Sequence, residues 1–166
     1  MSYKKRPVVS VIGAAESTAA QNADAEEIGR LLAEQSIIVV CGGRSGVMQA
    51  VCRGARNAGG LTIGILPGSD QDGGNPFLSV ALPTGLGHAR NVLVVLAGQV
   101  VIAIGGGFGT LSEIAMALRI GKKVIGLNTW QAENYRGEFA SIHEVDSPEG
   151  AVSAVNSFLS TTGSGS

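Results

Sequence analysis

Short, continuously apolar runs alternate along the chain with longer segments in which apolar residues recur at helical spacing. Continuous apolar runs are typical of strands buried on both faces of a parallel sheet. The predicted strands are 8–12, 37–40, 62–66, 77–82, 100–104, 123–127 and 142–145. The predicted helices are 19–35, 46–58, 88–96, 111–120 and a last one with Ser147 as N-cap and Pro148 at its first position.

This alternation predicts an α/β fold: a doubly wound parallel sheet, Rossmann-like, with right-handed crossovers and helices on both faces. Neither an internal repeat nor a linker interrupts it. We therefore expect one phosphate-binding domain over residues 1–160 and a flexible tail over 161–166.

Composition adds an expectation of self-association. Of the 166 residues, 45% are hydrophobic and only 15% are charged, which is little charge for a soluble monomer. The predicted helices around 89–96 and 111–120 are apolar nearly all round, a pattern of deep burial or of an interface between copies. We expect at least one of them to form an oligomer interface.

Charge and cysteine content narrow the function classes. A net charge of −1 gives no basic field for a nucleic-acid backbone, so we expect no nucleic-acid partner. No apolar run is long enough for a membrane span, and the one after the basic start is too short for a signal peptide. Cys41 and Cys52 lie in apolar or helical stretches and indicate reduced thiols in a cytoplasmic protein.

Three glycine-rich turns follow predicted strands, where ligands bind in open parallel sheets. They are Gly13-Ala14-Ala15, Cys41-Gly42-Gly43-Arg44-Ser45-Gly46 and Gly105-Gly106-Gly107-Phe108-Gly109-Thr110. Glycine lets a phosphate approach backbone N–H groups, and the N-terminus of the following helix favours its negative charge. Tight turns alone also explain single glycines, but two such runs between strand and helix favour anion binding.

Other classes of site lack their patterns. The first turn has no G-x-G-x-x-G, Cys41 stands where a ribose-binding acid is expected, and no P-loop occurs. The histidines and cysteines lack metal-ligand spacing, and no serine occupies a nucleophile elbow. A phosphorylated small molecule, bound without a protein-ligated metal, is the expected ligand.

Five polar side chains have alternative interpretations. Arg90 and Arg44 lie beside glycines, where a guanidinium can fork onto a phosphate, although a surface arginine is the simpler interpretation. His88 can titrate near neutrality or be structural. Thr110 and Glu113 have capping-box spacing, which accounts for both residues without a ligand; alternatively, Glu113 faces the pocket and meets a ribose or pterin hydroxyl.

The strings Gly42-Gly43-Arg44-Ser45-Gly46-Val47-Met48 and Gly105 to Glu113 resemble the Lonely Guy, or "lysine decarboxylase-like", superfamily over roughly residues 7–128. The resemblance implies a Rossmann-like fold. It also implies kinship with phosphoribohydrolases, which release the base from nucleoside 5′-monophosphates and leave ribose 5-phosphate.

Within that superfamily the chain is most similar to the molybdenum cofactor carrier proteins. The hydrolase pattern is P-G-G-x-G-T-x-x-E preceded by an Arg-Lys pair, whereas Gly105 and Asn91 stand here at the Pro and Lys positions. The carrier branch implies a homodimer or homotetramer that binds and shields molybdenum cofactor (molybdopterin), whose own dithiolene holds the metal. The alternative is a phosphoribohydrolase, since Arg90 and Glu113 match the catalytic pair: Arg90 would hold substrate, and Glu113 would activate water or stabilise charge on the ribose.

Overall fold

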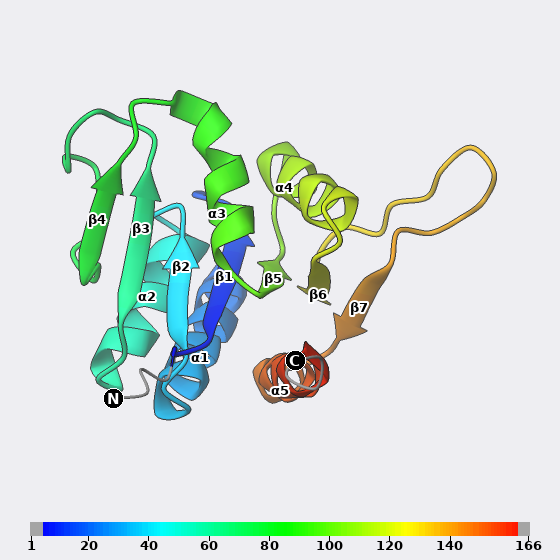
Figure 1. The fold of residues 1–166 in the computed structure, drawn as a ribbon, viewed down its shortest axis with the longest axis horizontal. Coiled ribbons are helices and arrows are strands. Elements are labelled where there is room, and N and C mark those ends of the chain that lie inside the picture. The colour runs from blue at the N-terminus through cyan, green and yellow to red at the C-terminus, as the bar shows by residue number, and fades with distance from the viewer. Residues whose placement is uncertain (1–4, 163–166) are drawn as a thin grey trace.

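Seven strands pair in parallel to form one sheet in the computed structural model, which describes residues 5–162 (Figure 1). The strands are β1 (Val8–Gly13), β2 (Ile38–Cys41), β3 (Thr62–Leu66), β4 (Val80–Pro83), β5 (Val100–Ile104), β6 (Lys123–Leu127) and β7 (Ile142–Val145). Their order is β4-β3-β2-β1-β5-β6-β7, so the direction of winding reverses between β1 and β5. This confirms the predicted doubly wound sheet.

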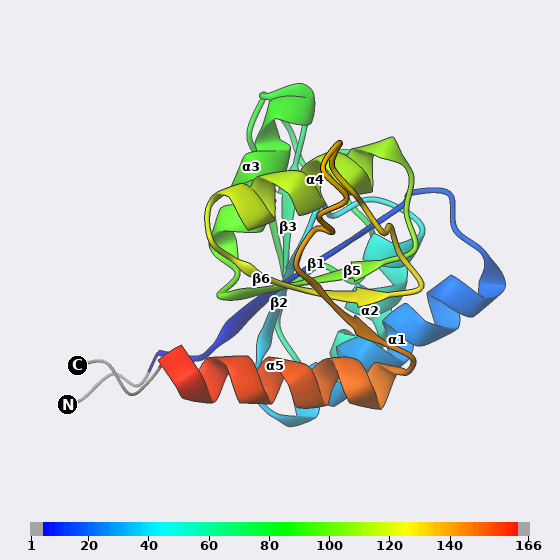
Figure 2. The same cartoon turned by 90° about the vertical axis from the view of Figure 1, so that its right-hand side faces the viewer.

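Helices cover both faces of the sheet and make three layers (Figure 2). They are α1 (Ala19–Glu34), α2 (Val47–Asn57), α3 (Asn91–Ala97, preceded by the 3-10 turn Gly87–Arg90), α4 (Phe108–Arg119) and α5 (Pro148–Thr162). One hydrophobic cluster joins α1, α2 and α5 to one face of the sheet, and a second joins α3 and α4 to the other. All five residues of β5 are buried, as its continuously apolar sequence predicts.

The observed elements differ from the predicted ones mainly at their boundaries. The strand expected over 77–82 begins only at Val80, and the helix expected from Leu111 begins at Phe108. The predicted cap of α5 is confirmed, because Ser147 Oγ accepts from the Gly150 N–H at 3.2 Å. Helix α5 includes residues 161 and 162 of the expected tail, and 163–166 lie outside the described residues.

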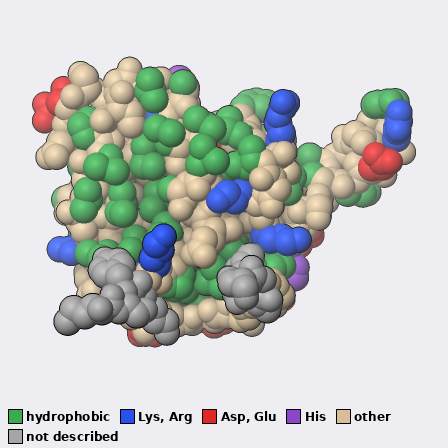
Figure 3. Space-filling view, in the orientation of Figure 1, with side chains coloured by type: hydrophobic (Ala, Val, Ile, Leu, Met, Phe, Trp, Pro, Cys, Tyr) green, Lys and Arg blue, Asp and Glu red, His purple; other side chains and the backbone are tan. Residues whose placement is uncertain are grey.

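Helices α3 and α4 leave part of their face of the sheet uncovered, beside β3 and β4. Val80 and Leu82 on β4, Leu86 before the 3-10 turn and Leu96 on α3 are each about half exposed. We call these four residues the apolar patch; Figure 3 shows extensive hydrophobic surface on this side of the molecule. In the described part of the chain, no helix is both long and apolar enough to cross a membrane.

Candidate functional site

The reversal of strand order brings the turns after β1, β2 and β5 to one edge of the sheet, where they border a pocket of about 510 Å³. We call it the central pocket. Its lining includes nine of the predicted site residues: Gly13, Ala14, Gly42, Arg44, Arg90, Gly107, Gly109, Thr110 and Glu113. His88 and Asn91, noted in the sequence, also line it.

Arg90 is a buried charged side chain of this pocket, and two hydrogen bonds hold it in place. It is only 7% exposed; its Nη2 donates to the carbonyl of Gly42 at 3.1 Å and its Nη1 to Asn91 Oδ1 at 2.6 Å. Its Nε is buried without a hydrogen-bond partner in the structure. A buried donor left unpaired is costly, so Arg90 is a fixed cation with one N–H that the described protein residues leave without an acceptor.

Asn91, which stands where the hydrolase pattern has a lysine, accepts a hydrogen bond from Arg90. A lysine here would add a second cation beside Arg90, whereas the Asn91 amide oxygen orients the guanidinium through a hydrogen bond. The substitution therefore exchanges a charge for a positioning contact.

Glu113 is the buried acid of the pocket, with 7% of its surface exposed. Burial raises the pKa of its carboxyl to about 7, although the positive charge of Arg90 opposes that shift. Among the described residues, no ion pair within 4 Å joins Glu113 to Arg90. Near neutral pH this carboxyl is thus partly protonated and adds less than a full negative charge to the pocket.

The N-terminus of α4 faces the pocket without a side-chain cap. The N-cap is Gly107, not Thr110, so the capping-box interpretation of Thr110 and Glu113 is wrong: α4 begins three residues too early for it. A side chain at Gly107 or Gly109 would meet no protein atom within 4 Å. No side chain therefore caps the first-turn N–H groups, and no side chain of Gly107 or Gly109 blocks a ligand from the backbone here, as an anion site requires.

Gly105 has φ +52°, and a side chain here would collide with Gln21 Nε2. A proline cannot adopt this φ, because its ring fixes φ near −65°. The turn observed here is therefore incompatible with the proline of the hydrolase pattern.

The other predicted glycines and Ser45 hold turns in place and are not among the residues that line the central pocket. Gly46 lies against the carbonyls of Ala14 and Ala15, and Ser45 Oγ donates to the Ala15 carbonyl at 3.2 Å. The Gly43 carbonyl accepts from the Asn75 N–H. Gly105 and Gly106 line a neighbouring pocket instead.

Cys41 and Cys52 are both buried, and their Sγ atoms lie 3.5 Å apart without a disulfide. The hydrogen bond with Cys41, together with burial, raises the pKa of Cys52 far above its ordinary value. Cys41 Sγ also accepts from the Gly43 N–H, so this thiol helps to fix the second turn.

The central pocket is also lined by Val11, Ile12, Met48, Pro67 and Gly87, none of which was among the predicted binding residues. Pro67 directly follows β3, so the rule that sites lie at the carboxyl ends of strands was the signal available for it.

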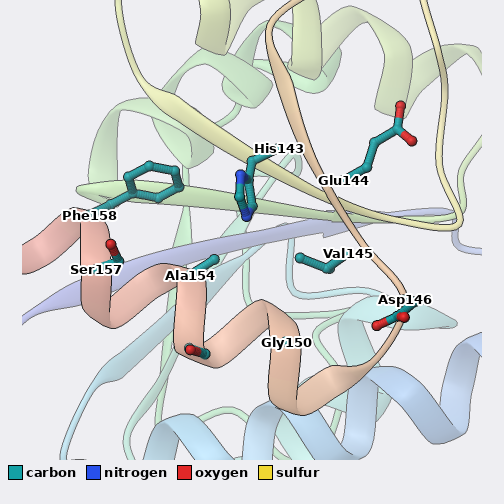
Figure 4. A pocket seen from close by; sticks show the side chains of 9 residues that line it. His143, Glu144, Val145, Asp146, Gly150, Ala154, Ser157 and Phe158 are labelled. Carbon is teal, nitrogen blue, oxygen red and sulfur yellow. The ribbon is translucent and has the colours of Figure 1, made fainter.

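A second hollow, of about 640 Å³, lies between β7 and α5 (Figure 4). The His143 ring stands edge-on to Phe158 there, with ring centroids 5.6 Å apart. Its charged lining is acidic, from Glu144 and Asp146, with no lysine or arginine. The central pocket, which contains Arg44 and Arg90, is the better phosphate site. No cluster of three potential His, Cys, Asp or Glu metal ligands occurs among residues 5–162.

In comparison with known proteins, the chain matches the model of the SLOG cluster4 family over residues 6–155. The molybdenum cofactor binding protein of Rippkaea orientalis has a similar structure, with a TM-score of 0.85 and 34% identity; the match covers 95% of this chain and 99% of that one. The molybdenum cofactor carrier protein of Chlamydomonas reinhardtii matches with a TM-score of 0.82 and 33% identity, over 93% and 99% of the two chains.

A probable cytokinin riboside 5′-monophosphate phosphoribohydrolase of Oryza sativa is 32% identical over 111 residues. The match covers 62% of this chain but only 45% of the rice protein. The structural likeness to the two molybdenum cofactor proteins is thus far more extensive than the sequence likeness to the hydrolase.

Proposed function

The chain belongs to the SLOG cluster4 family, and from this premise we propose that it binds molybdenum cofactor in the central pocket and carries it. The observation that carries the proposal is Arg90: buried, fixed by two hydrogen bonds, and with an unpaired Nε. The cofactor is the cargo, and its phosphate is the group for which these residues are suited.

The residues around Arg90 fit such a cargo. The N–H groups at the start of α4 and the guanidinium of Arg90 both favour a phosphate. The open space before Gly107 and Gly109 lets the phosphate approach the backbone. A pocket of about 510 Å³ lies within the range of small-molecule sites. The dithiolene of the cofactor would supply the ligands of molybdenum.

A carrier accounts for the departures from the hydrolase pattern better than an enzyme does. Asn91 orients Arg90 where the hydrolases have a second cation, and Gly105 has a backbone conformation closed to proline. We therefore favour carriage and shielding without catalysis.

Phosphoribohydrolase activity is the second candidate, because Glu113 and Arg90 both line the pocket and the rice relative is a probable hydrolase. In that function Glu113 would activate water, for which it must be ionised. Incubation with a panel of nucleoside 5′-monophosphates, followed by chromatography of free base, tests it. Release of base by the wild type but not by Glu113→Gln would establish the enzyme.

Cofactor loading tests the carrier. Protein incubated anaerobically with molybdenum cofactor is separated from free cofactor, and bound molybdenum and pterin are then measured. Gly109→Asp places a carboxylate in the open space where we place the phosphate, and an acid in the first turn of α4 does not harm the helix. Ser112→Asp adds the same charge to the exposed side of the same helix and is the matched control.

We expect wild type and Ser112→Asp to retain molybdenum and pterin, and Gly109→Asp to lose both while keeping its melting temperature. Equal loading of all three proteins would show that the phosphate of the cofactor does not bind at the start of α4. Absence of loading in the wild type would contradict the carrier itself.

We also propose that the protein works as a homodimer or homotetramer in the cytoplasm. The apolar patch is the surface we assign to self-association, because burying half-exposed leucine and valine side chains is favourable. Part of the patch lies on α3, one of the two helices singled out by the sequence. The free thiols Cys41 and Cys52 support a reducing compartment.

A further inference from the structure

Another pocket, of about 440 Å³, opens beside the glycine turn that follows β5. It lies between the first turn of α1, the turn itself and the segment that follows β6. Its lining residues are Gln21, Gly105, Gly106, Asn128, Thr129, Trp130 and Gln131, and we call it the amide pocket.

The amide pocket and the central pocket meet at the backbone of one turn. Gly106 lines the amide pocket and Gly107 lines the central pocket. Consecutive Cα atoms are only about 3.8 Å apart, so a group held at this turn borders both spaces. A ligand anchored here by phosphate can therefore extend to either side.

The conformation of the turn keeps the amide pocket open and in place. A side chain at Gly105 would run into Gln21, so only glycine leaves this space free. Thr129 Oγ1 donates to the Gly105 carbonyl at 2.5 Å, and Trp130 Nε1 donates to the Gly107 carbonyl at 3.1 Å. Two hydrogen bonds from the segment after β6 thus hold the turn in place on the side of the amide pocket.

The chemistry of the amide pocket differs from that of the central pocket. None of its lining side chains is charged, and three of them are amides, each with donor and acceptor atoms. Gln21 Oε1 already accepts from the Thr18 N–H, and Gln131 Nε2 donates to Glu144, but the other atom of each amide has no such bond among the described residues. The half-buried indole of Trp130 adds a flat apolar surface.

Neutral donors and acceptors beside an aromatic ring match a nucleobase and its ribose, whose edges offer the same mixture and whose base has a face for stacking. The uncharged side chains of the amide pocket would bind a further phosphate only weakly, so we place the phosphates of the ligand at the turn. These features distinguish a nucleoside from a further anionic group.

We propose that the amide pocket takes the nucleoside of a nucleotide-extended cargo, in which a diphosphate at the Gly105–Gly107 turn joins that nucleoside to the pterin in the central pocket. The proposal rests on the proposed function and specifies the chemical class of its cargo. The Gly106–Gly107 backbone is the junction between the two parts.

Calorimetric titration with GDP, CDP and inorganic pyrophosphate tests this. The wild type is expected to bind at least one nucleoside diphosphate roughly tenfold more tightly than pyrophosphate, because the nucleoside adds neutral hydrogen bonds in the amide pocket. Asn128 has φ +49°, so Asn128→Gly keeps the backbone conformation while it removes the amide. We expect this variant to bind that diphosphate roughly fivefold more weakly and pyrophosphate unchanged.

Ser36→Gly is the matched control, because Ser36 has φ +60° and, with Asn128, completes the pair of left-handed non-glycine residues among those described. It should leave all affinities unchanged. Two results would overturn the amide pocket as the nucleoside site. In one, Asn128→Gly still binds the nucleoside diphosphate more tightly than pyrophosphate by the same factor as the wild type. In the other, the wild type binds no nucleoside diphosphate more tightly than pyrophosphate. Absence of pyrophosphate binding in the wild type would instead contradict the phosphate site of the proposed function, so the two failures are distinguishable.

Discussion

The buried carboxyl of Glu113 makes a sharp prediction about stability and pH. Its pKa in the folded protein is about 7, against an ordinary value of 4.5. An acid whose pKa is raised by folding stabilises the fold most while it is protonated, below pH 4.5, and that stability is lost as the pH rises to about 7. Glu113→Gln cannot ionise and escapes this loss.

The magnitude follows from the pKa shift. Each unit of pKa corresponds to roughly 1 kcal/mol or a little more, so the full loss amounts to about 3 kcal/mol, most of which falls between pH 5 and pH 8. With 7% of Glu113 exposed, solvent screening reduces this little. The free energy of unfolding of Glu113→Gln, relative to wild type, should thus rise by roughly 2 to 3 kcal/mol between these pH values.

Urea denaturation followed by circular dichroism at pH 5, 6, 7 and 8 measures this difference, because the other titrating groups are common to both proteins and cancel. Glu16→Gln, which removes an exposed carboxylate, is the control. A difference that stays flat from pH 5 to pH 8 would mean that Glu113 is ionised throughout, and would refute the assignment of burial as the dominant effect.

Three further predictions concern binding and assembly. Pyrophosphate binding by the wild type should weaken as pH rises from 6 to 8 relative to binding by Glu113→Gln, because Glu113 becomes an anion. Calorimetry measures both affinities, and an equal pH dependence in the two proteins would contradict this. Arg90→Met should weaken pyrophosphate binding by about 10- to 100-fold, the value of a charged hydrogen bond, and unchanged affinity would exclude Arg90 from the site. Leu96→Glu should convert an oligomer to a monomer in analytical ultracentrifugation while Ile120→Glu, outside the apolar patch, should not; an unchanged assembly in Leu96→Glu would place the interface elsewhere.

Much of the fold was predictable because its signals are local. Strand β7 coincides with the run at 142–145, and the Ser147-Pro148 pair marks the start of α5 as expected. The position of the central pocket was also predictable, since parallel strands present their carboxyl ends at one edge and the glycine-rich turns stand there.

The errors arise where contacts distant in sequence override local signals. The segment before β4 stays irregular because Thr62 Oγ1 donates to the Phe77 carbonyl and accepts from the Ser79 N–H. Helix α4 starts at glycine-rich positions with no capping side chain, so no N-cap residue in the sequence indicates its true start. Thr110, which has the spacing of a capping residue, indicated a start that is three residues too late.

Two features of the site depend on tertiary contacts that the sequence does not reveal. The spacing of Arg90 and Asn91 shows neither that one side chain orients the other nor that Nε stays unpaired. The amide pocket joins Gln21 of α1 to residues more than a hundred positions later, across the turn at Gly105. No periodicity in the sequence predicts that juxtaposition.

The most direct test of the central claim is to locate the phosphate of the bound cofactor. Nuclear magnetic resonance of ¹⁵N-labelled protein, with and without molybdenum cofactor, follows the backbone amides and the Arg90 Nε–H. The account predicts the largest shifts at the amides of Gly107 and Gly109 and at Arg90 Nε. Shifts centred on His143 and Phe158, or none on saturation, would contradict it.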